Sequence, residues 1–193
     1  MNNYEINKYH RRSIRLQGYD YSQKGMYFLT ICVKDKECIF GTISNGNMIL
    51  NVIGHIVANE WENTPNIRDN IALHDYVIMP NHLHGIIEIT YNKNNEEQVG
   101  DFVSPKKSIG AIVRGFKIAT IKRIKALIDP VGKNSHSSSN GNSMIEEWII
   151  NHLPQIWQRN YHEHIIRNYE DHERIANYIN TNPLRWDEDM FNN

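Results

Sequence analysis

Two histidines, His82 and His84, stand two residues apart in the sequence. If this segment is a strand, its alternation points both imidazoles to the same face, where they could hold one metal ion. The neighbours Met79, Leu83 and Ile86 are apolar, and an imidazole in such surroundings is costly unless it meets a ligand or a polar partner. A metal site is one interpretation. Two hydrogen-bonded or surface histidines near a turn are the other, and they are the commoner origin of a bare H-x-H.

Tyr178 and Asn182 lie four residues apart, so on a helix both would project from one face. Pro183 disfavours the α conformation for the residue before it, which predicts that Asn182 stands at the end of the helix. A tyrosine hydroxyl has a reference pKa of about 10 and is a poor nucleophile unless a cation or a base assists it. A metal held by the histidine pair would give that assistance. Taken alone, Tyr178 would be a core aromatic whose hydroxyl reaches the surface.

The segment from Phe102 to Ile128 contains no acidic residue, although the whole chain has a net charge of -1. Its basic residues are Lys106, Lys107, Arg114, Lys117, Lys122, Arg123 and Lys125. A basic N-terminal arm adds Arg11, Arg12 and Arg15. A run of one sign in a chain of balanced charge favours phosphate binding, and a solvated helix face is the alternative.

A mixed aromatic and cationic string lies shortly before the last predicted helix. Its members are Trp157, Arg159, Tyr161, His162, His164 and Arg167. Aromatic rings suit the stacking of unpaired bases, and the cations suit phosphate oxygens. The core residues of an ordinary strand would look similar, so this string supports a nucleic-acid surface without establishing one.

The composition predicts one folded domain, because 193 residues with 40% hydrophobic content can bury one sizeable core. Cys32 and Cys38 are too few for a disulfide framework and do not form a CxxC pair. No segment approaches the roughly 20 apolar residues of a membrane span. A soluble, cytoplasmic protein without membrane association is therefore expected.

The hydrophobic pattern predicts where these residues sit. The expected elements, in order, are strands at 26–33 and 37–43, a hairpin turn at Asn45-Gly46, a helix at 52–63, strands at 71–78 and 84–91 joined through Met79-Pro80-Asn81, a helix at 108–127, a flexible loop at 134–143, an extended segment at 155–166 and a helix at 170–181. This order favours an α+β fold with helices packed on an antiparallel sheet. The expected division is a basic arm at 1–25, a single domain at 26–186 with a loop insertion at 131–144, and a tail at 187–193.

Five segments of the chain together resemble a known family. They are RRSIRLQGYDY (11–21), MPNHLHG (79–85), GAIVRGFK (110–117), WQRNYHEHIIRN (157–168) and YINTNPLRW (178–186). In this order they resemble the tyrosine transposases associated with repetitive extragenic palindromes (REP), which are single-tyrosine HUH transposases. His162 departs from the pattern, because an aromatic residue is commoner there in the family.

The resemblance implies a ferredoxin-like HUH fold with a central antiparallel sheet. It also implies that His82 and His84 are the metal pair, that Asn182 is the third ligand and that Tyr178 is the nucleophile. The implied ion is Mg²⁺ or Mn²⁺, whereas imidazole ligands alone would suggest zinc or another late transition metal.

The function expected from the residues and the resemblance is metal-dependent cleavage and transfer of single-stranded DNA near hairpins, through a 5′-phosphotyrosyl intermediate. The partner would be single-stranded or hairpin DNA with palindromic repeats, bound by a monomer or a homodimer. One alternative is a domesticated nucleic-acid-binding protein without catalysis. Another is a metal-dependent phosphodiesterase that uses water in place of tyrosine.

Overall fold

The computed structural model describes residue 16 and residues 18–91, 108–128 and 143–192. Arg11, Arg12, Arg15, Lys106 and Lys107 lie outside the described residues, as does the predicted loop except for its last residue. Ser143, that last residue, begins a helix.

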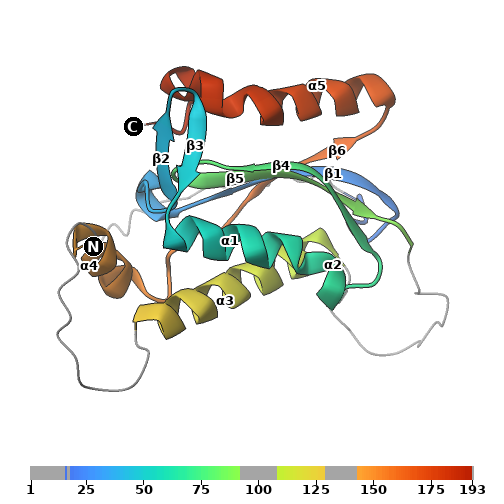
Figure 1. Ribbon diagram of the computed structural model, residues 1–193. Helices are drawn as coiled ribbons and strands as arrows, with labels where there is room; N and C mark the ends of the chain where they lie inside the picture. The colour runs from blue at the N-terminus through green and yellow to red at the C-terminus, as the bar shows by residue number, and fades with distance from the viewer. Residues whose placement is uncertain (1–15, 17, 92–107, 129–142, 193) are drawn as a thin grey trace, which may run out of the picture.

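A four-stranded antiparallel sheet forms the centre of the fold (Figure 1). Its strands are β1 (Gly25–Cys32), β4 (Ile71–Ile78), β5 (His82–Ile89) and β6 (His162–Ile166), in the order β4-β5-β1-β6. The chain passes from β1 to β4 and from β5 to β6 through helices, each time skipping one strand. This is the ferredoxin-like arrangement, so the predicted α+β fold is confirmed.

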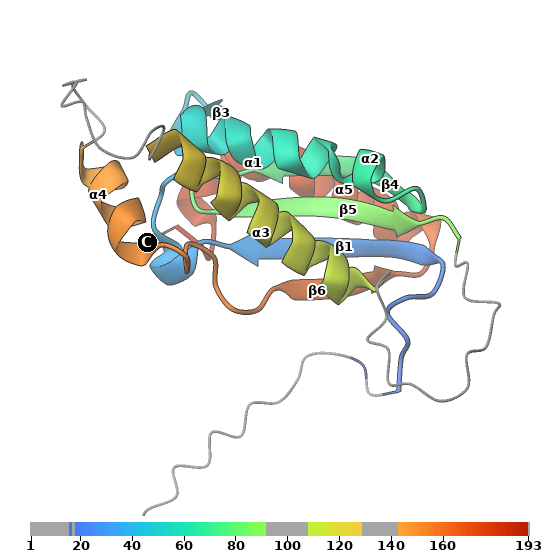
Figure 2. The ribbon, with the colours of Figure 1, turned by 90° about the horizontal axis from the view of Figure 1, so that it is seen from below.

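Helices cover both faces of this sheet. Helices α1 (Val52–Glu62) and α3 (Ile109–Ile128) pack on one face, and α5 (Tyr169–Thr181) lies along the other (Figures 1 and 2). The remaining elements are the short helices η1 (Lys34–Lys36), α2 (Thr64–Ile67), α4 (Ser143–His152) and η2 (Asn182–Glu188), and the hairpin of β2 (Gly41–Ser44) and β3 (Asn47–Leu50). Among the described residues, no helix has both the length and the apolar character needed to cross a membrane.

Strand alternation divides the interior into two unequal clusters. In β1, Tyr27, Leu29 and Ile31 belong to the large core shared with α1 and α3. The smaller cluster, under α5, contains Ile86 of β5 together with Ile175 and Ile179 of that helix. The α5 side therefore has few apolar contacts, and polar side chains take up part of its interior.

Most predicted elements are confirmed. The strand at 71–78 has the predicted bounds, and the helices predicted at 52–63, 108–127 and 170–181 agree within one residue at each end. The Asn45-Gly46 turn joins β2 to β3, with φ of 50° and 72° at its two residues. Positive φ at both positions is what a two-residue hairpin of the I′ type requires.

Several predictions about local structure were wrong. The strand predicted at 84–91 is β5, which begins and ends two residues earlier, at His82 and Ile89. The predicted strand at 37–43 begins only at Gly41, because Asp35 and Lys36 adopt positive φ and turn the chain after β1. The extended segment at 155–166 forms a strand only over its last five residues. The helix α4 was missed, because its start lies next to a polar stretch with no apolar pattern.

Asn182 stands at the end of α5, as predicted, but the backbone conformation predicted for it was wrong. The residue before Pro183 was expected to leave the α region, yet Asn182 has φ of -57° and ψ of -42°. The backbone continues through Pro183 as the 3₁₀ segment η2, in which the proline occupies the first turn. At that position the missing N–H of proline leaves no hydrogen bond unmade. The chain therefore carries on beyond α5 instead of turning away from it.

Candidate functional site

The two histidines begin strand β5 and are fully buried. His82 is 0% exposed and His84 is 1% exposed, and their ring centroids lie 4.4 Å apart. Both rings lie on the sheet face that α5 covers, where the Tyr178 ring lies 5.1 Å from that of His84. The alternation predicted for an H-x-H on a strand is thus observed.

A polar neighbour engages Nδ1 of each imidazole. Nδ1 of His82 lies 2.8 Å from Oδ1 of Asn81, and Nδ1 of His84 lies 2.8 Å from Oγ1 of Thr30. Within the described part of the chain, Nε2 of His82 is buried without a hydrogen-bond partner. Nε2 of His84 lies 3.1 Å from the hydroxyl of Tyr178. Nε2 of His84 therefore faces Tyr178 of α5, and Nε2 of His82 is left for a ligand.

Burial keeps both imidazoles uncharged. It lowers the pKa of His82 to about 3, because the protonated ring would lose its hydration without gaining an anionic partner of matching strength. It also lowers the pKa of His84 well below the ordinary value, and the neighbouring His82 acts in the same direction. Neutral imidazoles keep the lone pair that binds a metal ion.

Tyr178 and Asn182 meet at the C-terminal end of α5. Tyr178 is 36% exposed, and its ring stands edge-on to Phe28 of β1 with centroids 6.1 Å apart. Burial raises the pKa of the Tyr178 hydroxyl, and the charge of Asp189 adds to this rise, while a hydrogen bond from Asn182 lowers it. In the described residues, Oδ1 of buried Asn182 has no hydrogen-bond partner. The hydroxyl is thus in place beside His84 but is not acidic on its own.

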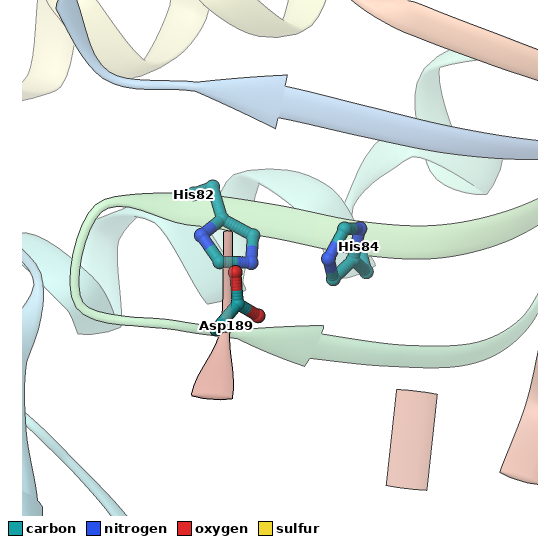
Figure 3. Close-up of side chains that lie close together, drawn as sticks. All are labelled: His82, His84 and Asp189. Carbon is teal, nitrogen blue, oxygen red and sulfur yellow. The ribbon is translucent and has the colours of Figure 1, made fainter. Parts of the chain in front are cut away.

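Asp189, in the segment after η2, adds a carboxylate that the sequence had not indicated. Ligand atoms of His82, His84 and Asp189 all lie within 4.8 Å of one another, as Figure 3 shows for the three side chains. Phe191 places its ring 4.6 Å from that of His82. No local spacing could have revealed Asp189, since only the fold brings the C-terminal segment to β5.

The donor set fits a divalent ion. Two neutral imidazoles and a carboxylate or amide oxygen are the ligand types that such ions take in proteins. His82 Nε2 and Asn182 Oδ1 are buried polar atoms for which the described residues offer no partner, and such atoms are costly unless something binds them. The site can therefore hold a metal ion, and its chemistry does not by itself identify which ion.

A cavity of about 650 Å³ opens beside Tyr178. Phe28, Ile175 and Phe191 give it apolar walls, and Asn160, His162 and Arg174 add polar groups. Flat apolar walls with a few polar groups suit an unpaired base or another planar ligand. The cavity thus extends the site from the imidazoles toward the edge strand β6.

Several predicted DNA-binding residues are engaged within the protein. Trp157 is 5% exposed and donates from Nε1 to Oγ1 of Thr120 at 2.8 Å, so its ring belongs to the core and is not open to a base. Lys117 donates from Nζ to the carbonyl oxygens of Gln158 at 2.7 Å and Asn160 at 3.0 Å. It holds the loop that borders the cavity, and burial lowers its pKa to about 8.

The other predicted DNA-binding residues differ in their surroundings. Arg123 pairs with the buried Glu60, and His164 lies 2.7 Å from a carboxylate oxygen of Asp171. The exposed members of this set are Arg114, Lys122, Arg159, Arg167 and also Arg123, whose side chain is 60% exposed although it pairs with Glu60. Helix α3, which carries several of these cations, and helix α5, which carries Tyr178, pack on opposite faces of the sheet (Figure 1).

Comparison with known proteins gives a close relative. No protein-family model matches the chain. A protein of Haemophilus influenzae, described only as uncharacterized, is 40% identical over 195 residues, and the match covers 97% of this chain and 96% of that protein. The chain belongs to the same family as this protein.

A solved structure shares the fold. It is a REP-associated tyrosine transposase bound to a REP hairpin, with a TM-score of 0.50 and 16% sequence identity, and the match covers 90% of this chain and 74% of that one. At this identity the similarity concerns the arrangement of sheet and helices. It agrees with the ferredoxin-like order of strands described above.

Burial of uncharged histidines predicts acid sensitivity of the metal-free protein. An unfolded chain protonates His82 below a pH of about 6.5, whereas the folded chain keeps it neutral down to a pH of about 3. The unfolded state then binds more protons, so stability is full above pH 6.5 and falls as the pH drops toward 3. The contribution of one such histidine is about 1.4 kcal/mol per pH unit in this window.

Urea unfolding at pH 7, 6 and 5 in the presence of a chelator would measure this slope. His82→Gln should reduce the slope by about 1 kcal/mol per unit between pH 6 and 5. The same substitution at His55, which is exposed on α1, should leave it unchanged. Equal slopes for wild type and His82→Gln would show that His82 is not buried in its neutral form.

Proposed function

We propose that this protein is a metal-dependent endonuclease and strand transferase that cuts single-stranded DNA near hairpins and forms a 5′-phosphotyrosyl intermediate. The observation that carries the proposal is the 3.1 Å separation between the Tyr178 hydroxyl and Nε2 of His84. The neighbouring His82 has a buried Nε2 without a hydrogen-bond partner among the described residues. A tyrosine and a metal-binding histidine pair are thus adjacent on one face of the sheet. The structure with the same fold is a tyrosine transposase bound to a hairpin, which supports this choice among the uses of the fold.

The metal would be held by His82 and His84, with an oxygen from Asn182 or Asp189. A bound divalent ion such as Mn²⁺ or Mg²⁺ would polarise the phosphate and stabilise the charge that develops on its oxygens. The raised pKa of Tyr178 makes such assistance necessary, because the hydroxyl is otherwise protonated and weakly nucleophilic.

Tyr178 is the proposed nucleophile. Its hydroxyl gives up its proton and its oxygen forms a bond to phosphorus, while the bond from phosphorus to the 3′ oxygen breaks. The released 3′ oxygen takes up one proton to become a free 3′-hydroxyl, so protons balance over the step. The phosphate remains on the tyrosine, so attack by the same or another 3′-hydroxyl rejoins the strand. The energy of the broken bond is kept in the intermediate, and no ATP is required.

Other described residues are proposed to guide the DNA. The cavity beside Tyr178 would receive an unpaired base against Phe28 and Ile175. Exposed cations would hold phosphates of the hairpin. From the exposed cations of the described residues the proposal takes Arg114, Lys122, Arg159 and Arg167, and it extends to five residues outside them, Arg11, Arg12, Arg15, Lys106 and Lys107.

The covalent intermediate gives the decisive test. Labelled single-stranded DNA carrying a hairpin from the flanks of the gene should form a denaturant-resistant adduct with wild-type protein when Mn²⁺ is present. Tyr178→Phe should abolish the adduct, because the only atom removed is the attacking oxygen. Tyr169→Phe makes the same change at an exposed position of the same helix and should leave the adduct unaffected.

The alternatives give different results in this assay. Cleavage without an adduct, retained in Tyr178→Phe, would indicate a phosphodiesterase that uses water. Binding without cleavage or adduct on these substrates would indicate a DNA-binding protein without catalysis. Each of these results contradicts the proposed mechanism.

The oxygen ligand can be identified by comparing two substitutions. If Asn182 is the third ligand, Asn182→Ala should weaken Mn²⁺ binding about tenfold or more, because an oxygen donor is removed. Asp189→Asn should then change the affinity much less. Titration calorimetry of the DNA-free protein would measure both, and the reverse order of effects would assign the third position to Asp189.

Phosphate binding by α3 predicts a change in salt dependence. Replacing Arg114 and Lys122 by alanine should lower the magnitude of the slope of log K against log salt by about 0.7 to 0.9 for each phosphate that the protein no longer neutralises. Hairpin binding measured by fluorescence anisotropy across a salt series would give the slope. An unchanged slope would exclude this face of α3 from the DNA interface.

A further inference from the structure

Asn81, in the turn between β4 and β5, touches three segments that are far apart in the sequence. It is 1% exposed, and its backbone carbonyl accepts a hydrogen bond from the N–H of Val33 at 2.8 Å. Its side chain contacts the backbone at Lys36, the backbone at Phe191 and the ring of His82. The position of this amide is therefore fixed from several directions.

The contacts with the backbone distinguish the nitrogen of the Asn81 side-chain amide from its oxygen. The same amide atom of Asn81 lies 2.8 Å from the carbonyl oxygen of Lys36 and 2.8 Å from that of Phe191. A carbonyl oxygen can only accept a hydrogen bond, so this atom must be the NH₂ group, with both of its hydrogens used. The other end of the side chain is then the oxygen, Oδ1.

The orientation of Asn81 in turn decides the proton of His82. Oδ1 of Asn81 lies 2.8 Å from Nδ1 of His82, and an amide oxygen cannot donate, so Nδ1 must carry the hydrogen. A neutral imidazole has one N–H, and Nε2 is left with a lone pair. A hydrogen on Nε2 would be a buried donor for which the described residues have no acceptor, which is an expensive arrangement.

We propose that Asn81 is a positioning residue that holds His82 in the Nδ1–H tautomer and so directs the lone pair of Nε2 toward the metal. The inference rests on the metal site of the proposed function. His84 has no equivalent control, because its partner is the hydroxyl of Thr30, which can donate or accept and follows either tautomer.

The tautomer can be measured on the wild-type protein without metal or DNA. Nitrogen-15 spectra of histidine-labelled protein at pH 8 distinguish protonated from unprotonated ring nitrogens, and the spectrum of His82→Gln identifies the His82 signals. The expected result is a protonated Nδ1 and an unprotonated Nε2. The opposite tautomer, or a mixture of the two, would overturn the proposal.

Two substitutions separate the effect on the tautomer from a purely structural effect. Asn81→Ala removes the acceptor, so His82 should lose its preference for Nδ1–H and Mn²⁺ affinity should fall about 10- to 100-fold. Asn81→Asp keeps an acceptor beside Nδ1 but cannot donate to Lys36 and Phe191, so it should keep the tautomer and most of the affinity. Asn81→Asp could keep the tautomer and still lose as much Mn²⁺ affinity as Asn81→Ala. The hydrogen bonds to Lys36 and Phe191 would then be what supports metal binding, and the proposal would fail.

Asn51→Ala is the matched control. Asn51 also bridges separate segments, donating from Nδ2 to the carbonyl of Ile39 at 2.9 Å and accepting from the N–H of Gly54 at 2.9 Å. Its loss should lower stability without changing the His82 tautomer or the Mn²⁺ affinity of the folded protein. If Asn81→Ala does not fold, the wild-type spectrum and Asn81→Asp still decide.

These measurements do not depend on DNA cleavage. If wild-type protein binds Mn²⁺ with the expected tautomer but never forms an adduct, the role of Asn81 stands and the proposed function fails. If the adduct forms but the tautomer is reversed, the function stands and the role of Asn81 fails.

Discussion

Two uncharged imidazoles buried side by side at the start of β5 are the constraint on which the rest of the site depends. An imidazole removed from water needs polar partners, and the protein provides them asymmetrically. Asn81 and Thr30 engage the Nδ1 atoms of His82 and His84, which leaves the two Nε2 atoms for other partners. Asn81, in the turn before β5, thus fixes the lone pair of His82 on Nε2, whereas the hydroxyl of Thr30 on β1 can accompany either tautomer of His84.

The two faces of the sheet have different roles, one structural and the other chemical. The α1 and α3 side holds the large apolar core, whereas the α5 side has a small apolar cluster and the polar site. On α5, Ile175 and Ile179 pack against the sheet, and Tyr178 and Asn182 share the same side of the helix one turn further on. The packing of two isoleucines therefore places the Tyr178 hydroxyl beside His84 and the Asn182 amide against that hydroxyl.

The segment after α5 completes the site. Because the backbone at Pro183 continues into η2, the chain returns over the histidines, where Asp189 adds a carboxylate and Phe191 covers the rings. Asn81 donates to the carbonyl of Phe191, so the turn that leads into the histidine strand also holds this segment. The ligand environment is therefore built from β1, β5, α5 and the C-terminal segment together.

Local sequence patterns determined the elements and the faces of the key residues. Strand alternation put His82 and His84 on one side of β5, helical spacing put Tyr178 and Asn182 on one side of α5, and Asn45-Gly46 specified a hairpin, because each of these depends only on residues a few positions apart. The tertiary structure alone decided that α5 lies over β5, that Asp189 reaches the histidines and that Trp157 and Lys117 are engaged inside the protein. Those outcomes depend on contacts between segments that are distant in the sequence, and the spacing of residues within one segment carries no information about the free energy of such contacts. These contacts bring the separate residues together into one site.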